Sequence, residues 1–379
     1  MMSRRRIVGA LAALVACGGL AAGLIASSSS TAASTPAWLA KVDATVAQAY
    51  KGQDMVVPPG PKGVSGKSIW NLACTLTIPD CANANAGVTE AGAALGWKVT
   101  SVDTNTNPIT AGQDILNAIA AHADGIVIVG IDCPAIQSSM QQAKAANIPV
   151  IVIGGLNCTP PLYTGTAYIA NLPFEAGQAG PYTLDRIDWA IAQTHGNLKM
   201  IVVNISDFST AAGQTAAALQ DLKVCPTCKV VDEINLSIQN LPALGQLLPA
   251  ALNQYPQANS VFLYSGSALI TGAQTAIENA GRATGKNQIQ VVSAEGDYGE
   301  PGLIRKGWDI GFTGLSINWT GWQSVDFLNR LFHGVAASKL PKLGVGLQLV
   351  DATHNLPKGN AWSPPINYEA DYLKEWGVK

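Results

Sequence analysis

Charge is scarce in this sequence. Only 13% of its 379 residues are Asp, Glu, Lys or Arg, against about 25% in an ordinary soluble protein, and the net charge is −2. Because there is no basic excess to neutralise phosphates, the composition argues against nucleic acid as the main partner. Long blocks of like charge are also missing. With 48% hydrophobic residues, the chain has the length and composition for one large or two medium domains.

Motifs of enzymes and metal centres are lacking as well. The sequence contains no G-x-S-x-G, H-E-x-x-H, Walker or G-x-G-x-x-G motif. A hydrolase built from two acidic residues is still open, but no pair of acids singles itself out. The four histidines are scattered, and the single C-x-x-C has no second cysteine or histidine pair at zinc-binding spacing. We therefore expect a protein that is not an enzyme and that carries neither a metal nor another cofactor.

The N-terminus has the organisation of an export signal. A basic run over 3–6 precedes an apolar stretch over 7–16. The residues Leu-Val-Ala-Cys at 14–17 resemble the bacterial lipobox, in which the cysteine is lipidated and becomes the new N-terminus. On this interpretation 1–16 is a signal peptide and Cys17 carries the lipid.

The segment after the signal leaves three interpretations open. In the lipoprotein interpretation, 17–66 is a lipid-anchored tether and leading segment. In the second, the protein is secreted after cleavage in the small-residue run 27–34. In the third, 7–26 stays as an uncleaved anchor, since it has about the ~20 residues that a membrane span needs.

From residue 67 onward, segments typical of strands and helices alternate. Strands buried on both faces form continuous apolar runs, and strands separated by helices indicate parallel βαβ units. The predicted strands are 68–73, 98–102, 125–131, 148–154, 199–203, 229–234, 260–264 and 290–293. The predicted helices are 83–95, 111–122, 134–146, 211–223, 242–254, 271–280, 320–333 and 368–376. Two successive runs of this kind predict an α/β protein with two doubly wound, parallel-sheet domains.

Two successive predicted strands are each followed by a cysteine, in GIVIVGIDC and IPVIVIGGLNC. A right-handed crossover lays these strands side by side and parallel, so both cysteines fall at one edge of the sheet, where a disulfide is geometrically reasonable. Ligands of open α/β sheets bind at the same edge. Disulfides form in the oxidising environment outside the cell. If Cys17 carries the lipid, six of the seven cysteines remain, and six cysteines allow fifteen connectivities. We predict the pairs Cys74–Cys81, Cys133–Cys158 and Cys225–Cys228.

A redox role for Cys225-Pro-Thr-Cys228 is the weaker interpretation of that motif. A thioredoxin-type cysteine opens a helix after a strand, whereas this motif lies in a turn between a predicted helix and the next strand. A disulfide that closes the turn fits better.

The order of several motifs resembles that of the type I periplasmic binding proteins, of the sugar-binding, ribose-binding-like kind that serve ABC importers. The resemblance covers roughly 67–355. IWNLACTLTIPDC, VTSVDTNTNP, IVIVGID and IPVIVIGG are similar to the first four strands of that family with their loops. YIANLPFEAGQAG is similar to the first hinge crossing, ALITGAQTAIENAGR to a helix of the second lobe, and VVSAEGD with GLIRKGW to a strand ending in Asp-Gly and the helix after it.

The resemblance implies two lobes joined by three crossings, which close like a hinge on a ligand between them. The crossings then fall at 169–171, 315–317 and 344–349. The N-terminal lobe is 67–168 plus 318–343, and the C-terminal lobe is 171–314 plus 350–379.

The sequence departs from the family where the family binds sugar. The aromatic pair that stacks on sugars falls on Asp80 and Cys81, and an Asp-Arg pair falls on Gly154 and Gly155. An arginine of the second lobe falls near Gly213. Each buried hydrogen bond to a charged group is worth about 1.5–3 kcal/mol, so their loss makes a small aldose a doubtful ligand. We expect a roomier, less polar pocket for a larger or partly apolar molecule.

Further positions of the family's site are also changed. An asparagine falls near Ser265, the Asp of Asp-Gly becomes Glu295, and the last pocket glutamine falls on Leu315. Phe208 follows a predicted strand of the second lobe. Trp319 follows the second crossing and could stack on a ligand, whereas Trp322 is expected to pack within the protein. The predicted ligand-binding residues are Asp80, Gly155, Phe208, Ser265, Glu295 and Trp319.

The resemblance implies capture of a small solute on the extracytoplasmic side of the bacterial membrane. The expected partners are the ligand, a lipid anchor and an ABC permease that senses closure of the lobes. The protein itself is expected to be a monomer. The alternative is a module that presents its ligand to a chemoreceptor or sensor kinase, and an extracellular enzyme comes third. A DNA-binding repressor of related fold is disfavoured, because an export signal rather than a helix-turn-helix precedes the domain.

Overall fold

The computed structural model describes residues 35–167, 180–342 and 344–378. The predicted signal peptide 1–16, the lipid site Cys17 and the first predicted crossing, 169–171, lie outside the described residues. Over the part of the chain that is described, no helix is long and apolar enough to cross a membrane.

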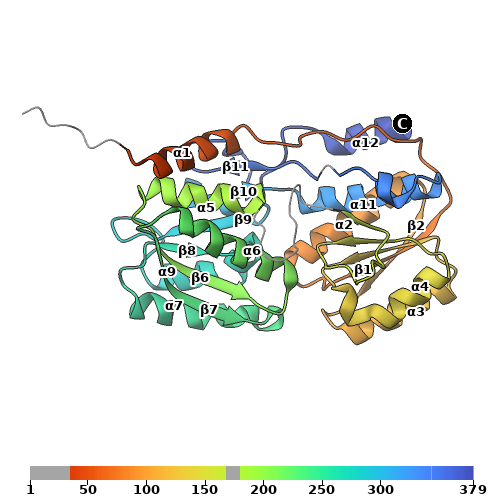
Figure 1. Ribbon diagram of the computed structural model, residues 1–379, viewed down its shortest axis with the longest axis horizontal. Helices are drawn as coiled ribbons and strands as arrows, with labels where there is room; N and C mark the ends of the chain where they lie inside the picture. The colour runs from red at the N-terminus through yellow and green to blue at the C-terminus, as the bar shows by residue number, and fades with distance from the viewer. Residues whose placement is uncertain (1–34, 168–179, 343, 379) are drawn as a thin grey trace, which may run out of the picture. The chain divides into compact units, whose positions relative to one another are not determined.

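The first lobe is a five-stranded parallel sheet in the order β2-β1-β3-β4-β5. Helices α2 and α11 cover one face of the sheet, and α3 and α4 cover the other (Figure 1). The strands are β1 Ser68–Ala73, β2 Lys98–Asp103, β3 Gly125–Val129, β4 Val150–Ile153 and β5 Gly165–Ala167. The helices are α2 Pro79–Ala94, α3 Pro108–Ala120, α4 Gln137–Ala145, α11 Ile317–Phe332 and α12 Tyr368–Trp376.

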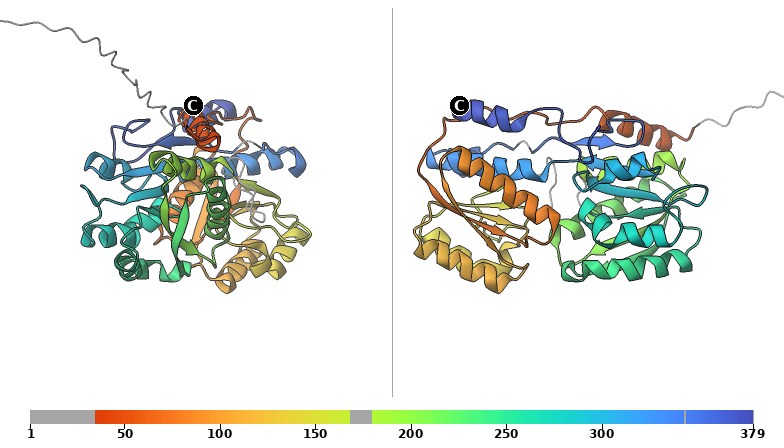
Figure 2. Two further views of the ribbon diagram at one scale, coloured as in Figure 1. Left: turned by 60° about the vertical axis from the view of Figure 1, so that its left-hand side comes forward. Right: turned by 180° about the vertical axis from the view of Figure 1, so that it is seen from behind.

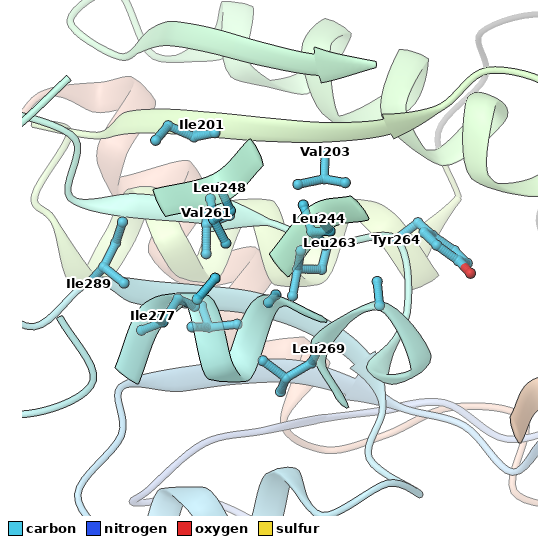
Figure 3. Packing of buried hydrophobic residues seen from close by; sticks show 14 of the residues in the cluster. Ile201, Val203, Leu244, Leu248, Val261, Leu263, Tyr264, Leu269, Ile277 and Ile289 are labelled. Atoms are coloured by element: carbon cyan, nitrogen blue, oxygen red, sulfur yellow. The ribbon is translucent and has the colours of Figure 1, made fainter. Parts of the chain in front are cut away.

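The second lobe is a six-stranded sheet in the order β11-β10-β9-β8-β6-β7, parallel except for β11, which pairs antiparallel with β10. Figure 3 shows its aliphatic core, where α7 and α9 pack on the central strands. The strands are β6 Lys199–Ile205, β7 Lys229–Leu236, β8 Ser260–Phe262, β9 Gln290–Glu295, β10 Ile310–Gly314 and β11 Gln348–Val350. The helices are α1 Ala37–Ala49, α5 Pro181–Gln193, α6 Ser209–Asp221, α7 Leu244–Gln254, α8 Gly266–Ala268, α9 Gln274–Asn279 and α10 Glu300–Arg305.

The predicted fold class is confirmed: both lobes are doubly wound α/β units with buried central strands. Strands β3 and β4, for example, are buried at every position, as their continuous apolar runs predict. The three disulfides join the predicted pairs, Cys74–Cys81, Cys133–Cys158 and Cys225–Cys228. The first two lie at the carboxyl edge of the first sheet, and the third closes the turn before β7.

Strand β10 was not predicted, and its glycines explain why. A Cβ atom at Gly311 would collide with the indole of Trp189, and one at Gly314 would collide with Trp362. Glycine in a strand marks such close approaches, but it also weakens the pattern of side chains by which strands are recognised. The short strands β5 and β11 were missed as well.

The chain also crosses between the lobes at two places besides the three predicted crossings. The predicted crossings 315–317 and 344–349 join β10 to α11 and α11 to β11. In addition, helix α1 packs against α5 of the second lobe, and the segment 50–66 then runs to the first lobe. The tail crosses once more before α12. Figure 2 shows both added segments along the same side of the protein as α11.

Helix α12 corrects the expected division of the chain. The whole of 350–379 was expected in the second lobe, and Trp362 does belong to the core of that lobe. Helix α12, however, buries Tyr372 and Trp376 against Trp322 of α11, in the core of the first lobe. The aromatic spacing of the tail predicts a helix but not the lobe on which the helix packs.

Candidate ligand-binding cavity

A cavity of about 90 Å³ lies where the carboxyl ends of the two sheets face each other. The first lobe lines it with residues after β1, β3 and β4, and the second lobe with residues at or after the ends of β6, β8 and β9. In each sheet the strand order reverses there, between β1 and β3 and between β6 and β8, which is where open α/β sheets bind ligands. These strand-end residues are Cys74, Gly130, Gly154, Phe208, Tyr264 and Glu295.

The walls of the cavity are largely apolar. They include Ile78, Val129, Ile153 and Ile238 together with the Cys74–Cys81 bridge. This agrees with the expectation of a pocket less polar than that of a sugar-binding protein. The volume does not agree with a roomy pocket, because sites for drug-sized ligands have about 300–1,000 Å³.

Four of the six predicted ligand-binding residues line the cavity. Asp80 enters from the first lobe, and Phe208, Ser265 and Glu295 enter from the second. All four follow or end a strand, or open the helix after it, so the topology of parallel sheets brings them to one edge.

Trp319 does not lie at the cavity. Its ring is 1% exposed and stacks on Tyr368 of α12, with ring centroids 4.9 Å apart and planes 4° from parallel. A Cβ atom at Gly346, on the returning crossing, would lie 3.2 Å from Cζ3 of the indole. The expectation that Trp319 stacks on a ligand is therefore corrected: it packs α11 against α12 and the hinge. Trp322 packs within the same aromatic cluster, as predicted.

Gly155 is also absent from the cavity lining. A Cβ atom at this position would meet the carbonyl oxygen of Ile131, because the loops after β3 and β4 lie against each other beside the Cys133–Cys158 bridge. Its neighbour Gly154, with φ of +64°, is the glycine that lines the cavity.

Glu295 is held in an unusual conformation. It ends β9 with φ of +68°, a left-handed conformation that costs a residue with a side chain roughly 1–3 kcal/mol, and it is 3% exposed. Its carboxylate accepts hydrogen bonds from Tyr182 Oη and from the backbone N–H of Gly266, the latter at 2.9 Å. Burial, with a further contribution from the Asp80 carboxylate, raises the pKa of Glu295 well above its usual range.

Asp80 faces Glu295 from the other lobe. It lies in the first turn of α2, where the helix N-terminus favours a negative charge. Its Oδ1 accepts a hydrogen bond from Ser267 Oγ of the second lobe at 2.8 Å. Burial raises the pKa of Asp80, and hydrogen bonds from neighbouring hydroxyls oppose this.

A buried arginine lies behind the cavity, and the sequence pattern did not single it out. Arg186 of α5 is fully buried between the rings of Tyr182 and Phe262, 5.0 and 4.9 Å from their centroids. It donates to the carbonyl oxygens of Leu263 and Tyr264 and to the side chain of Gln214. Tyr182 lines the cavity from the first turn of α5 and Gln214 from the interior of α6, and neither position directly follows a strand.

Three buried hydroxyls of the cavity lining make no hydrogen bond of regular geometry with the described residues: Thr210 Oγ1, Tyr264 Oη and Ser265 Oγ. The hydroxyl of Ser265 nevertheless lies near enough to Asp80 and Tyr264 to act on the pKa of both. Each of these residues is at most 7% exposed. In Figure 3 the hydroxyl of Tyr264 points away from the aliphatic core of its lobe. Because an unsatisfied buried polar group costs about 1–3 kcal/mol, these hydroxyls mark places where a ligand can supply hydrogen bonds.

Hydrogen bonds also join the lobes directly around the cavity. Ser209 Oγ donates to Asp132 Oδ1 at 2.7 Å, in addition to the bond between Ser267 and Asp80. Asn83 donates to the hydroxyl of Tyr298 at 3.3 Å. The lobes are therefore in contact across the cavity, in a closed arrangement. Among the described residues, no cluster of His, Cys, Asp or Glu is placed to hold a metal ion.

Solved structures of the same fold are solute-binding proteins. The chain is similar to the 5-methylthioribose transporter solute-binding protein of Thermotoga lettingae, with 16% identity, a TM-score of 0.66, and coverage of 82% of this chain and 93% of that one. A solute-binding protein of Burkholderia graminis in complex with D-arabinose has 19% identity, a TM-score of 0.65, and coverage of 79% and 99%. One from Bacillus halodurans with bound myo-inositol has 14% identity, a TM-score of 0.62, and coverage of 82% and 100%.

Sequence comparison agrees with the fold. Among curated proteins, none matches this chain. The family model described as a periplasmic binding protein domain matches residues 75–334, more than half of the chain and all the strand-end residues that line the cavity except Cys74. With its two doubly wound lobes and the cavity at their carboxyl edges, the chain belongs to the periplasmic binding protein family.

Proposed function

We propose that this protein binds a small organic solute outside the cytoplasm and delivers it to an ABC importer. The observation that carries the proposal is the cavity itself, which takes its lining from the strand ends of both lobes while hydrogen bonds join the lobes around it. A solute held there contacts both lobes only when they are closed, so binding stabilises the closed state, which a permease can recognise.

The ligand contacts are assigned to Asp80, Phe208, Ser265 and Glu295, together with Tyr182, Thr210 and Tyr264. Support comes from their position at the cavity and from the hydroxyls that make no hydrogen bond of regular geometry with the described residues. The similar proteins of known structure bind 5-methylthioribose, D-arabinose and myo-inositol, which are small neutral molecules. The apolar walls favour a less hydroxylated molecule than an aldose.

The protein acts as a monomer and as a binding protein rather than an enzyme. A role as ligand-presenting module of a chemoreceptor or sensor kinase is the second candidate, because the same closure can be sensed by either partner. Growth on the identified solute distinguishes them: deletion of the gene abolishes uptake in the first case and leaves uptake intact in the second.

We also propose that Cys17 anchors the protein to the extracytoplasmic face of the membrane through a lipid. The support is the box at 14–17 after a basic and apolar leader. Cys17→Ala should move the protein from the membrane fraction to the soluble extracytoplasmic fraction. A variant that stays with the membrane would favour the uncleaved anchor instead.

The test of the binding function is to find the solute. Native mass spectrometry of protein purified without refolding should detect a small molecule bound one to one. After its removal, adding the solute back should lower the radius of gyration measured by small-angle X-ray scattering, because the lobes close. A solute that binds while the radius of gyration stays constant would contradict capture by closure.

A further inference from the structure

Apart from its tyrosines, the ionisable side chains that line the cavity are carboxyl groups. Asp80 and Glu295 line it from opposite lobes, and no Lys, Arg or His is among the described residues of its lining. Two more buried carboxyl groups, Asp297 and Glu300, lie near enough to Asp80 to interact with it electrostatically. Burial raises the pKa of Asp80 and Glu295, so a ligand with a positive charge stabilises their ionised forms, whereas a neutral or anionic ligand does not.

The nearby guanidinium does not form an ion pair with these acids. Arg186 donates its hydrogen bonds to two backbone carbonyl groups and to the side chain of Gln214. Its guanidinium group lies over two aromatic rings. The ion pairs of the described residues involve neither Asp80 nor Glu295. The guanidinium of Arg186, outside the lining, is therefore a single cation beside the carboxyl groups of Asp80 and Glu295. The carboxyl groups of Asp297 and Glu300 add to this excess of acids.

The rest of the lining suits the body of an organic cation. The rings of Phe208 and Tyr264 meet edge to face, with centroids 6.3 Å apart, and Tyr182 adds a third ring at the cavity. Ammonium groups are attracted to aromatic faces within about 6 Å, and apolar walls accept the methyl and methylene groups that such a cation carries. The hydroxyl of Thr210, which has no hydrogen-bond partner among the described residues, can accept a hydrogen bond from an N–H or O–H group.

We propose that the solute is a small organic cation, a compact apolar body whose ammonium group lies between Asp80 and Glu295. The inference rests on the proposed solute-binding function and specifies its ligand class. A sugar would satisfy the carboxylates with hydroxyl groups but would press its other hydroxyls against isoleucines and the disulfide. A carboxylated solute would meet like charge on both sides.

The test compares cations with neutral molecules of the same shape. Isobutylammonium and isobutanol form one pair, and choline and 3,3-dimethylbutan-1-ol form another, while ribose and myo-inositol represent polyols. Binding is measured by isothermal calorimetry on the mature extracytoplasmic protein after removal of any co-purified solute. We expect at least one cation to bind ten times more tightly than its neutral partner.

Variants locate the effect. Asp80→Asn and Glu295→Gln each keep the shape of the side chain and remove one group that can ionise, and each should lower the affinity for the cation at least tenfold while changing that for the neutral partner less than threefold. Glu278→Gln on the exposed side of α9 is the matched control and should change neither. Thermal melting of each variant verifies that it is folded. Asp80→Asn and Glu295→Gln change different lobes, so each tests the proposal separately.

The outcomes separate this inference from the proposed function. If ribose or myo-inositol binds and the cations do not, the inference is overturned while solute binding stands. Equal affinity for charged and neutral partners, or cation binding unchanged in both variants, also overturns it. If no compound of the panel binds, the inference is overturned as well, and the co-purified solute decides the proposed function separately.

Discussion

Phe208 and Trp319 are aromatic residues that each follow the carboxyl end of a strand and lie at the start of a helix, yet their surroundings differ. Phe208 is partly exposed at the cavity, next to Tyr264 and over Gly130 of the other lobe. Trp319 is enclosed by Tyr368 and the crossing at Gly346. One ring is therefore available to a ligand, while the other holds parts of the protein together.

Substituting the two aromatic residues should separate affinity from stability. We expect Trp319→Ala to lower the free energy of unfolding by about 3–5 kcal/mol, because a large buried side chain leaves a cavity, and to leave the affinity for the co-purified solute within twofold. Phe208→Ala should do the reverse, with a tenfold loss of affinity and a smaller loss of stability. Urea denaturation and calorimetry measure both, and a tenfold loss of affinity in Trp319→Ala would return this residue to the site.

The predictable part of the site consists of residues at strand ends. Asp80, Phe208, Ser265 and Glu295 could be located from the sequence because parallel strands place their carboxyl ends at one edge. Trp319 and Gly155 were misplaced because the position of each depends on a segment distant in sequence, α12 for Trp319 and the Ile131 loop for Gly155. Tyr182 was missed because no helix was predicted over 181–193. Gln214 was missed because a helix pattern shows which residues are apolar, not which residues face the other lobe.

At the scale of elements, helix α1 shows how much of the fold escapes sequence patterns. It begins after a small-residue run that was interpreted as part of a tether, and it buries Leu39, Val42 and Val46 against α5. Its apolar residues have the spacing of one helix face, but nothing in the nearby sequence indicates that this face packs on the second lobe. Under α1, three carboxyl groups of α5 and α6 lie close together: Asp185, Asp188 and Asp221.

These carboxyl groups make the stability of this region depend on pH. Burial, followed by the charge of a neighbouring acid in the group, raises the pKa of each to about 7, and Lys41 of α1 partly opposes this for Asp188 and Asp221. The usual pKa of Asp in an unfolded chain is about 3.9, so between about pH 4 and pH 7 the folded state binds more protons than the unfolded state. The free energy of unfolding should therefore fall as the pH rises through this window and level off above it.

Asp188→Asn isolates the contribution of the group. Other buried acids of the protein act in the same direction, so the test is the difference between variant and parent. We expect urea denaturation at pH 5, 6, 7 and 8 to show a smaller loss of stability in the variant, whereas Asp43→Asn on the exposed face of α1 should follow the parent. Parallel curves for Asp188→Asn and the parent would mean that these acids are already ionised in the folded protein at pH 5.

At the scale of the whole molecule, the two added crossings tie the lobes together on the hinge side. Arg330 of α11 donates to the carbonyl oxygens of Pro58 and Pro59, and the N–H of Gly63 donates to the carbonyl oxygen of Trp376. On the other lobe, Tyr50 donates to Asp351. The resemblance to the family implies three crossings and does not include these two, because they lie before and after the stretch that it covers, roughly 67–355.

Closure itself should depend on the bonds on the opposite side, around the cavity. Ser209 donates to Asp132 across the lobes at 2.7 Å, and neither side chain lines the cavity. Ser209→Ala removes a bond to a charged group that exists only in the closed state, so the closed state should lose about 1.5–3 kcal/mol and the affinity for the solute should fall by about tenfold or more.

The direct contacts with the solute remain in Ser209→Ala, so the loss should be in closure and not in recognition. The affinities for different solutes should fall by the same factor, and small-angle scattering should require more solute to reach the closed radius of gyration. Ser338→Ala, at an exposed position away from the cavity, is the matched control. If the affinity of Ser209→Ala equals that of the parent, water or a neighbouring group replaces the bond, and closure depends on the solute alone.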